Sequence, residues 1–330
     1  MRAPEFWKKP GPLALLLAPL GWIYGASVAR KARHAAPYKS SARVICIGNL
    51  TAGGSGKTPV AMAVAEQLIA RGKKVFFLTR GYGGSQAGPL LVKGQSADVV
   101  GDEALLLARI APTIVSRDRA AGARLAEAQG AEVIVMDDGH QNFSLRKDLS
   151  LVVVDGASGF GNGLMIPAGP LRESVAQGLA RADAVIVMND GSEERSDEDG
   201  RAPKRARGSP DLGSFAGPVL RAHLAPEDNV FRGKRVFAFA GIGRPEKFVE
   251  TLRAAGVIVT DSQFFADHHP YSTAEIAALR RRAAGALLVT TEKDFARLDK
   301  ALAAGIEYLP VRARFDAAVV PLLDRMLAGV

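Results

Sequence analysis

The chain has 330 residues, of which 48% are hydrophobic and 23% are charged. This length and composition allow one large or two smaller folded domains and exclude a compositionally disordered protein. The single cysteine, Cys46, excludes an internal disulfide framework and suits a reducing compartment. The net charge of +9 comes mainly from residues 1–43, where eight Lys and Arg stand against Glu5 alone and contribute +7. Basic and aromatic residues are not interleaved across the rest of the chain, so we expect no nucleic-acid partner.

Residues 10–29 contain no charged side chain and are flanked by basic residues at both ends. Four interpretations fit such a segment: a secretory signal peptide, a membrane-spanning helix, a helix lying in the membrane interface, and a helix buried in the protein's own core. A proline and glycines within the segment weaken the spanning interpretation. We favour an interfacial helix within residues 1–35 that docks through residues 5–33, with Trp22 and Tyr24 at headgroup depth.

The apolar run 44–48 leads into a glycine-rich loop, and good helix formers follow at 61–68. Glycines let backbone N–H groups converge on phosphate oxygens, and a helix N-terminus favours anions. Lys57 would reach the β- and γ-phosphates of a nucleotide, and Thr58 would hold Mg²⁺. The strict phosphate-loop pattern has Gly where this chain has Thr51, so a glycine-rich turn without a chemical role is the alternative. We expect nucleotide phosphates to be bound by Thr51, Ala52, Gly53, Gly54, Ser55, Gly56, Lys57 and Thr58.

Apolar strands and helices alternate along the rest of the chain. Strands are expected at 74–79, 112–115, 133–136 and 149–154, helices at 103–110 and 119–129, and a second series of strands at 184–188, 236–240, 257–260, 286–290 and 306–311. Strands without polar alternation are typical of a parallel sheet covered on both faces. The predicted fold class is therefore α/β, with a P-loop NTPase-type, mostly parallel sheet domain at 36–170 and a second, smaller α/β domain at 171–330. The polar, turn-rich residues 191–217 are expected to form a mobile surface insertion.

The strand predicted at 133–136 ends in Asp137 and Asp138. Ligands of open α/β sheets bind beyond the carboxyl ends of the strands, and carboxylates there can hold Mg²⁺ directly or through water. A polar junction between strand and loop is the alternative interpretation. With a phosphate loop in the same chain we favour a metal site, and which of the two carboxylates contacts the ion stays open.

Seven motifs follow one another in the order found in a known enzyme family. They are GNLTAGGSGKTP (48–59), RGY (80–82), GDE (101–103), DDGHQ (137–141), PAGPLRE (167–173), DHHPY (267–271) and TEKD (291–294). As a set they resemble the tetraacyldisaccharide 4′-kinases, the lipid A 4′-kinases of Gram-negative bacteria. The resemblance implies transfer of the ATP γ-phosphate to the 4′-hydroxyl of a tetraacyldisaccharide 1-phosphate, a glycolipid, at the cytoplasmic face of the inner membrane.

The resemblance also implies roles for individual residues. Asp102 would take the proton of the acceptor hydroxyl, with His268 as its partner. Lys57 and Arg172 would stabilise phosphate charge. The metal site would be formed or supported by Thr58, Asp137, Asp138, Gln141 and Glu173, and the lipid headgroup would meet Arg80, Tyr82 and Arg119.

Purely structural interpretations of these residues stay open. Asp102 stands where a helix N-cap belongs, Arg172 and Glu173 alone would be an ordinary ion pair, and His268 alone would more often be structural. His140 stands where the family usually has Phe or Leu, and the carboxylates before it are kept. Segment 291–294 is expected to be specific to the fold and near the nucleotide cleft.

Two other functions compete with the kinase. One is a membrane-associated nucleotide switch that hydrolyses ATP or GTP, although no guanine-reading motif is found. The other is a kinase for a soluble small molecule, with residues 10–29 in the core. Because motifs lie in both predicted domains, we expect a cleft between the domains that closes over ATP and a lipid headgroup.

Overall fold

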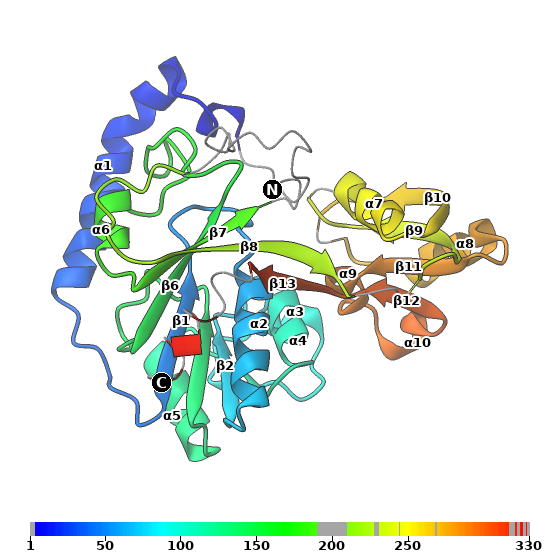
Figure 1. The fold of residues 1–330 in the computed structure, drawn as a ribbon, viewed down its shortest axis with the longest axis horizontal. Coiled ribbons are helices and arrows are strands. Elements are labelled where there is room, and N and C mark those ends of the chain that lie inside the picture. Colours follow the sequence, from blue (N-terminus) through cyan, green and yellow to red (C-terminus); the bar gives the residue numbers. More distant parts are fainter. Residues whose placement is uncertain are drawn as a thin grey trace.

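The computed structural model describes residues 4–189, 210–227, 231–243, 245–267 and 269–316, together with residues 321, 324, 325 and 328. His268 and residues 191–209 of the predicted insertion lie outside these ranges. The described chain forms a larger sheet, a smaller sheet beside it, and a long N-terminal helix on the far side of the larger sheet (Figure 1).

Within the described residues the larger sheet has nine strands in the order β13-β8-β7-β6-β1-β5-β2-β4-β3. They are β1 (Arg43–Gly48), β2 (Val75–Thr79), β3 (Leu90–Leu91), β4 (Thr113–Val115), β5 (Val133–Asp137), β6 (Leu149–Asp155), β7 (Ala184–Asn189), β8 (Val219–Pro226) and β13 (Val311–Phe315). The pairs are parallel except for the edge pairs β13–β8 and β3–β4. The predicted mostly parallel sheet is confirmed.

Helices cover both faces of this sheet. Successive side chains on a strand point to opposite faces, so strands that are apolar throughout have two apolar faces to bury. Ile45 and Val135 pack with α2 (Lys57–Ala70) and α4 (Asp102–Leu107) on one face. Val44 and Ile134 pack with α5 (Arg119–Ala128) on the other, and α6 (Val175–Leu179) covers the neighbouring part of that second face. The short helix α3 (Ala97–Val100) directly precedes α4. With both faces buried, polar side chains collect at the ends of the strands.

The smaller sheet has the order β10-β9-β11-β12, and its strand pairs are all parallel. Its strands are β9 (Arg235–Ala240), β10 (Ile258–Phe264), β11 (Leu287–Thr291) and β12 (Ile306–Leu309). Phe248 of α7 (Pro245–Ala254) packs on one face, and Ile276 of α8 (Thr273–Ala283) packs on the other. The short helices α9 (Glu292–Phe295) and α10 (Lys300–Ala303) follow β11. A second α/β unit is therefore present, as expected.

The junction between the two sheets does not coincide with the domain boundary predicted at residue 170. Strands β7, β8 and β13 come from residues 171–330 and yet pair in the larger sheet. The strand expected at 306–311 is in fact two strands in different sheets, separated at Pro310. Proline has no N–H to donate to a ladder, so it interrupts the pairing there.

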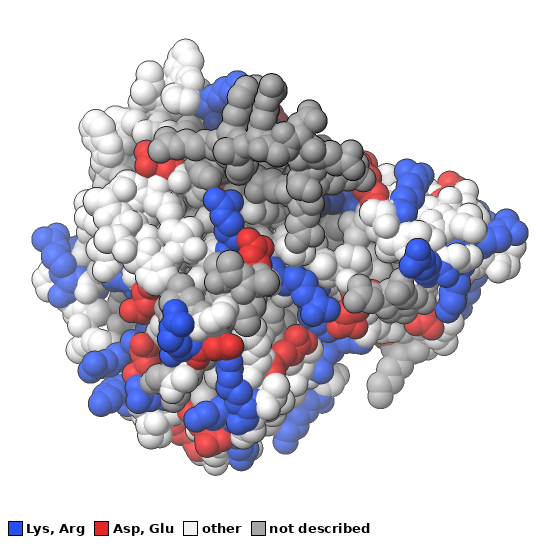
Figure 2. Space-filling view, in the orientation of Figure 1, with Lys and Arg blue, Asp and Glu red and all other residues white. Residues whose placement is uncertain are grey.

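A 3-10 helix (Glu5–Trp7) and the 22-residue helix α1 (Pro12–Arg33) form the N-terminal region. The residues of α1 that face the protein are small, namely Ala14, Ala18, Gly21 and Gly25. Large apolar side chains point outward instead, with Leu16 exposed by 76% and Trp22 by 65%. Figure 2 shows the surface over α1, at the upper left, as mainly uncharged. By length and composition α1 is apolar enough to cross a membrane, and 22% of its most apolar window is buried in the protein.

Candidate active site

The glycine-rich loop between β1 and α2 ends at a helix N-terminus. Gly53 and Gly56 have φ values of 128° and 84°, in the left-handed region that favours glycine. The buried side-chain amide of Asn49 donates to the Thr51 carbonyl at 2.8 Å and so braces the start of the loop. Gly56 is the N-cap of the 14-residue helix α2, whose first N–H groups and dipole favour an anion. The geometry expected of a phosphate loop is present.

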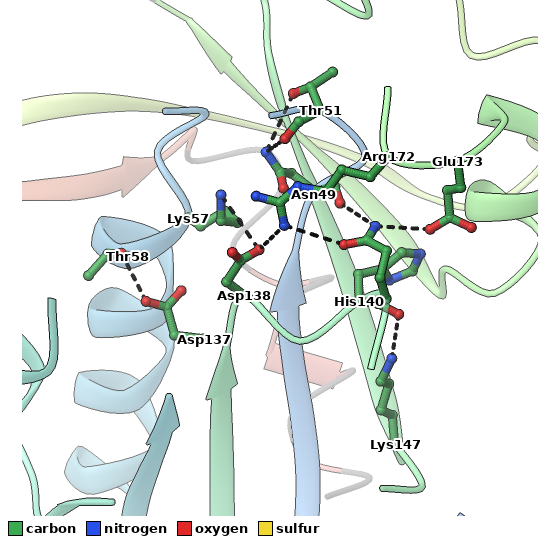
Figure 3. Close-up of polar contacts among 11 residues, drawn as sticks. Asn49, Thr51, Lys57, Thr58, Asp137, Asp138, His140, Lys147, Arg172 and Glu173 are labelled. Carbon is green, nitrogen blue, oxygen red and sulfur yellow. Dashed lines mark hydrogen bonds and ion pairs between the residues drawn. The ribbon is translucent and has the colours of Figure 1, made fainter. Parts of the chain in front are cut away.

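Thr58, on the first turn of α2, meets the end of β5. Its hydroxyl donates to Oδ2 of Asp137 at 2.9 Å (Figure 3). Asp137 is 1% exposed, and its Oδ1 has no hydrogen-bond partner within the described part of the chain. A buried carboxylate oxygen without a donor is costly, and such atoms are commonly completed by an ion or a ligand.

Asp138 faces the cationic side of the same site. Its Oδ1 lies 3.7 Å from Nζ of Lys57 and accepts a hydrogen bond from Nη1 of Arg172 at 2.9 Å (Figure 3). Its φ of 51° is unusual for a residue other than glycine, though Asp tolerates it better than most. Burial acts to raise the pKa of Asp138, but Lys57 and Arg172 outweigh it and hold that pKa below its ordinary value. Asp138 is therefore ionised at neutral pH.

Gln141 and Glu173 lie one step further out. Nε2 of Gln141 donates to the Asn49 carbonyl at 2.8 Å and to Oε1 of Glu173 at 2.9 Å. Oε2 of Glu173 accepts from Arg181 at 2.6 Å, and Glu173 is 1% exposed. Within the described residues, the hydrogen bonds of Glu173 therefore lead to Gln141 and Arg181 and not to the carboxylates at the end of β5. Arg181 is a residue that the sequence analysis did not identify.

A Mg²⁺ ion fits these residues if it enters with a nucleotide. Among the described residues, no group of three or more His, Cys, Asp or Glu could hold a metal ion by itself. Mg²⁺ at phosphate-transfer sites uses one or two carboxylates together with phosphate oxygens and water. The orphaned Oδ1 of Asp137 and the hydroxyl of Thr58 are oxygen ligands of the required kind.

Asp102 lies at the start of α4 and reaches the smaller sheet's unit. The N-cap of α4 is Gly101, without a side-chain cap, so Asp102 is in the first turn and is not the capping residue. Its Oδ2 accepts a hydrogen bond from Nε of Arg297 at 2.8 Å and forms an ion pair with Nη2 of Arg297 at 2.7 Å. Arg297 was missed by the sequence analysis, because a pair 195 residues apart leaves no signal in a single sequence. His268, its expected partner, lies outside the described residues.

The residues expected to meet a headgroup divide into exposed and buried ones. Tyr82 is 72% exposed, and Arg80 is exposed at the end of β2. Arg119 is 3% exposed, and it donates to the Ser116 carbonyl while its Nε has no partner in the described chain. Burial lowers the pKa of Arg119 to about 10, so its guanidinium remains charged at neutral pH. Arg119 would act from beneath the site, and Arg80 and Tyr82 from its surface.

His140, where this chain departs from the family pattern, is fully buried. Its ring nitrogens lie 2.9 Å from the Gly178 carbonyl and 3.2 Å from Oγ of Ser150, and Lys147 donates to its carbonyl at 2.7 Å. Burial, followed by the charge of Lys147, lowers the pKa of His140 to about 3. A buried histidine that is neutral at neutral pH and has a partner at each ring nitrogen is a packing residue.

Comparison with known proteins gives one consistent family. The family model "Tetraacyldisaccharide-1-P 4'-kinase" (LpxK) matches residues 13–328. A tetraacyldisaccharide 4′-kinase of Paramagnetospirillum magneticum is 50% identical over 335 residues, covering 99% of this chain and 99% of that protein. One of Rhodospirillum rubrum is 49% identical over 337 residues, covering 100% of this chain and 99% of that protein.

Among solved structures, the fold is similar to that of LpxK from Aquifex aeolicus, described as its "apo" form in complex with ATP. The TM-score is 0.76 at 23% sequence identity, and the match covers 96% of this chain and 99% of that one. At this identity the likeness shows the fold alone. It supports the assignment of an α/β fold with two parallel sheets.

The buried carboxyl of Asp137 predicts a pH dependence of stability. Burial, followed by the neighbouring Glu103 carboxylate, raises the pKa of Asp137 from 3.8 to about 7. The folded protein thus binds this proton more tightly than the unfolded chain does. The stabilising effect of the proton is complete below about pH 4 and is lost as the pH rises through about 7, with each pH unit between worth at most about 1.4 kcal/mol.

Asp137→Asn removes this dependence, because an amide is neutral at every pH. We expect urea denaturation of the ligand-free protein to show D137N more stable than wild type near pH 8, by on the order of 2–4 kcal/mol, and not near pH 4. Asp138→Asn is the matched control: its carboxylate is held ionised by cations, so its loss lowers stability near pH 8. Equal stabilities of D137N and wild type near pH 8 would contradict the prediction.

Proposed function

The chain belongs to the tetraacyldisaccharide 4′-kinase family of lipid A biosynthesis, and from that premise we propose that it transfers the γ-phosphate of ATP to the 4′-hydroxyl of a tetraacyldisaccharide 1-phosphate. The observation that carries this proposal is the meeting of Lys57 and Thr58, at the N-terminus of α2, with Asp137 and Asp138 at the end of β5. Phosphoryl transfer depends mainly on positioning and charge stabilisation, and this arrangement supplies both.

Residues 51–58 hold the triphosphate in this proposal, with the N-terminus of α2 directed at it. Lys57 and Arg172 neutralise phosphate oxygens, and their present partner Asp138 keeps both cations in place. Thr58 and Asp137 would hold Mg²⁺, which polarises the transferred phosphoryl group when bound. Gln141 and Glu173 would support this shell through the hydrogen bond from Gln141 to the loop carbonyl of Asn49.

Asp102 accepts the proton of the 4′-hydroxyl in this proposal, because a sugar hydroxyl is a weak nucleophile until a base removes its proton. It lies between the two sheets, where it is 12% exposed and bonded to Arg297. His268 would assist it from the segment after β10. Arg80, Tyr82 and Arg119, which follow β2 and β4, would bind the anionic headgroup. We also propose two functional units: one built on the larger sheet, including β7, β8 and β13, and one built on the smaller sheet.

The outer face of α1 is proposed to dock on the cytoplasmic face of the inner membrane. Its small side chains are already used in packing, whereas Leu16, Trp22 and Ile23 are each more than half exposed. Three cations, Arg30, Lys31 and Arg33, lie in its last turn and would meet anionic lipid. A helix so placed would bring the glycolipid acceptor to the enzyme.

Phosphate transfer to lipid tests the proposed function directly. Purified full-length protein in detergent micelles is supplied with γ-labelled ATP, Mg²⁺ and the tetraacyldisaccharide 1-phosphate. We expect label in the lipid, and a loss of at least about 100-fold in Lys57→Ala, because Lys57 stabilises phosphate charge. Lys93→Ala, which removes an exposed lysine between β3 and α3, is the control and should keep wild-type activity. Free phosphate without labelled lipid would favour the nucleotide switch instead.

The role of Asp102 is separable from nucleotide binding. Asp102→Ala should lower kcat by about 10²–10⁴-fold, the usual contribution of a general base, and leave the affinity for ATP unchanged. Asp118→Ala is the matched control, since Asp118 accepts from the N–H groups of Ala120 and Ala121 as the cap of α5. D118A should lose thermal stability and keep kcat. Parallel losses of kcat and ATP affinity in D102A would indicate a structural role.

Membrane docking by α1 predicts a measurable loss of vesicle binding. Replacing Leu16, Trp22 and Ile23 together by Ser should lower co-sedimentation with phosphatidylglycerol-containing vesicles by at least about 100-fold. The reason is that each serine has less apolar surface to bury in the bilayer than the residue it replaces. Ala26→Ser, at another exposed position of α1, should leave binding unchanged. Equal sedimentation of the triple variant and wild type would exclude α1 as the docking surface.

A further inference from the structure

We propose that Arg297, a residue of the smaller sheet's unit, is the positioning residue that fixes the carboxylate of Asp102 for proton removal. This inference rests on the proposed function, in which Asp102 is the base. Nε of Arg297 donates to Oδ2 of Asp102 at 2.8 Å, and Nη2 forms an ion pair with the same oxygen at 2.7 Å. The side chains are 6% and 12% exposed, so water screens the contact little.

The guanidinium is itself held on its other side. Its Nη1 donates to Oδ1 of Asp294 at 2.9 Å and to the Gly241 carbonyl at 3.2 Å. Asp294 is fully buried, and its Oδ2 accepts from the Gly241 N–H at 3.0 Å and the Thr291 hydroxyl at 2.7 Å. Since Gly241 follows β9 and Thr291 ends β11, the arginine is anchored to two strands of the smaller sheet.

The backbone of Asp102 is fixed from the larger unit. Gly101, its N-cap, has a φ of 84°, and a Cβ there would lie 2.3 Å from the Tyr82 carbonyl oxygen. The backbone conformation at the start of α4 is therefore restricted. The backbone does not determine the orientation of the Asp102 side chain, so its bonding partners do. The planar, forked guanidinium of Arg297 is suited to fix that orientation. A lysine could bond Asp102 or Asp294 but would not reproduce the fork.

Adhesion between the two units is the competing explanation, and other contacts already provide it. Nη1 of Arg312, on β13, donates to Oε2 of Glu292 on α9 at 2.8 Å, and Nε donates to Glu66 of α2 at 3.1 Å. Nε of Arg109 lies 3.8 Å from Glu292. The pairs of Glu292 with Arg312 and with Arg109 join the units without touching Asp102. Arg312 therefore provides a control that separates adhesion from positioning.

The test is a double-mutant cycle on lipid phosphorylation. Arg297→Gln should lower kcat about 100-fold, the scale of a misplacement of the reacting group by about 1 Å, with KM and ATP affinity nearly unchanged. Its thermal midpoint should fall, because the buried carboxylate of Asp294 loses its cationic partner, so kcat is measured at a temperature at which the variant is folded. Arg297→Lys, which keeps the charge and the fold, should lose less. In the Asp102→Ala background, Arg297→Gln should cost nothing more, because the group that it positions is gone.

Arg312→Gln is the matched control, and it should change kcat by the same small factor in both backgrounds. The inference is overturned if Arg297→Gln keeps wild-type kcat, or lowers kcat by the same factor with and without Asp102. A crystal structure of the Arg297→Gln variant adds a readout independent of activity: an Asp102 carboxylate in its original orientation would also overturn the inference. Failure of the wild-type protein to label the lipid would instead overturn the proposed function.

Discussion

The hydrogen bond between Thr58 and Asp137 is the contact on which the rest of the site depends. It joins the first turn of α2 to the carboxyl end of β5, and both elements are fixed independently. The helix packs its apolar side across one face of the larger sheet, and β5 is held in parallel register with β1, with Ile47 opposite Asp137. Lys57 and Asp138 are the chain neighbours of the bonded pair, so the same contact brings them together.

This contact also places an electrostatic cost where the chemistry is proposed to occur. Asp137 is desolvated, has an oxygen without a donor in the described part of the chain, and carries a raised pKa, all of which oppose folding with the carboxylate ionised. The same properties support the proposal that it binds a cation that arrives with a nucleotide. Asp138, one residue further, is held ionised by Lys57 and Arg172. The pKa values of two adjacent carboxylates are thus shifted in opposite directions because their surroundings differ.

Ion pairs join the two units at this edge. Asp102 extends from α4 of the larger unit and pairs with Arg297 of the smaller unit, which is itself held by Asp294. The proposed base is therefore complete only when both units are docked. In that proposal, a base held in this way links the position of the smaller sheet to the reaction.

The sequence alone determined the α/β class, the phosphate loop, the paired carboxylates and the apolar N-terminal helix, because each is encoded by neighbouring residues: β-branched runs, glycines before Lys57, and a strand that ends in Asp137. It did not reveal that β7, β8 and β13 belong to the larger sheet, or that Pro310 divides two strands. Which strands pair is determined by packing between segments that are far apart in the sequence. An apolar run does not indicate which sheet it belongs to. The bond between Asp102 and Arg297 was likewise decided by tertiary structure, since only the docking of two folded units brings residues 195 positions apart into contact.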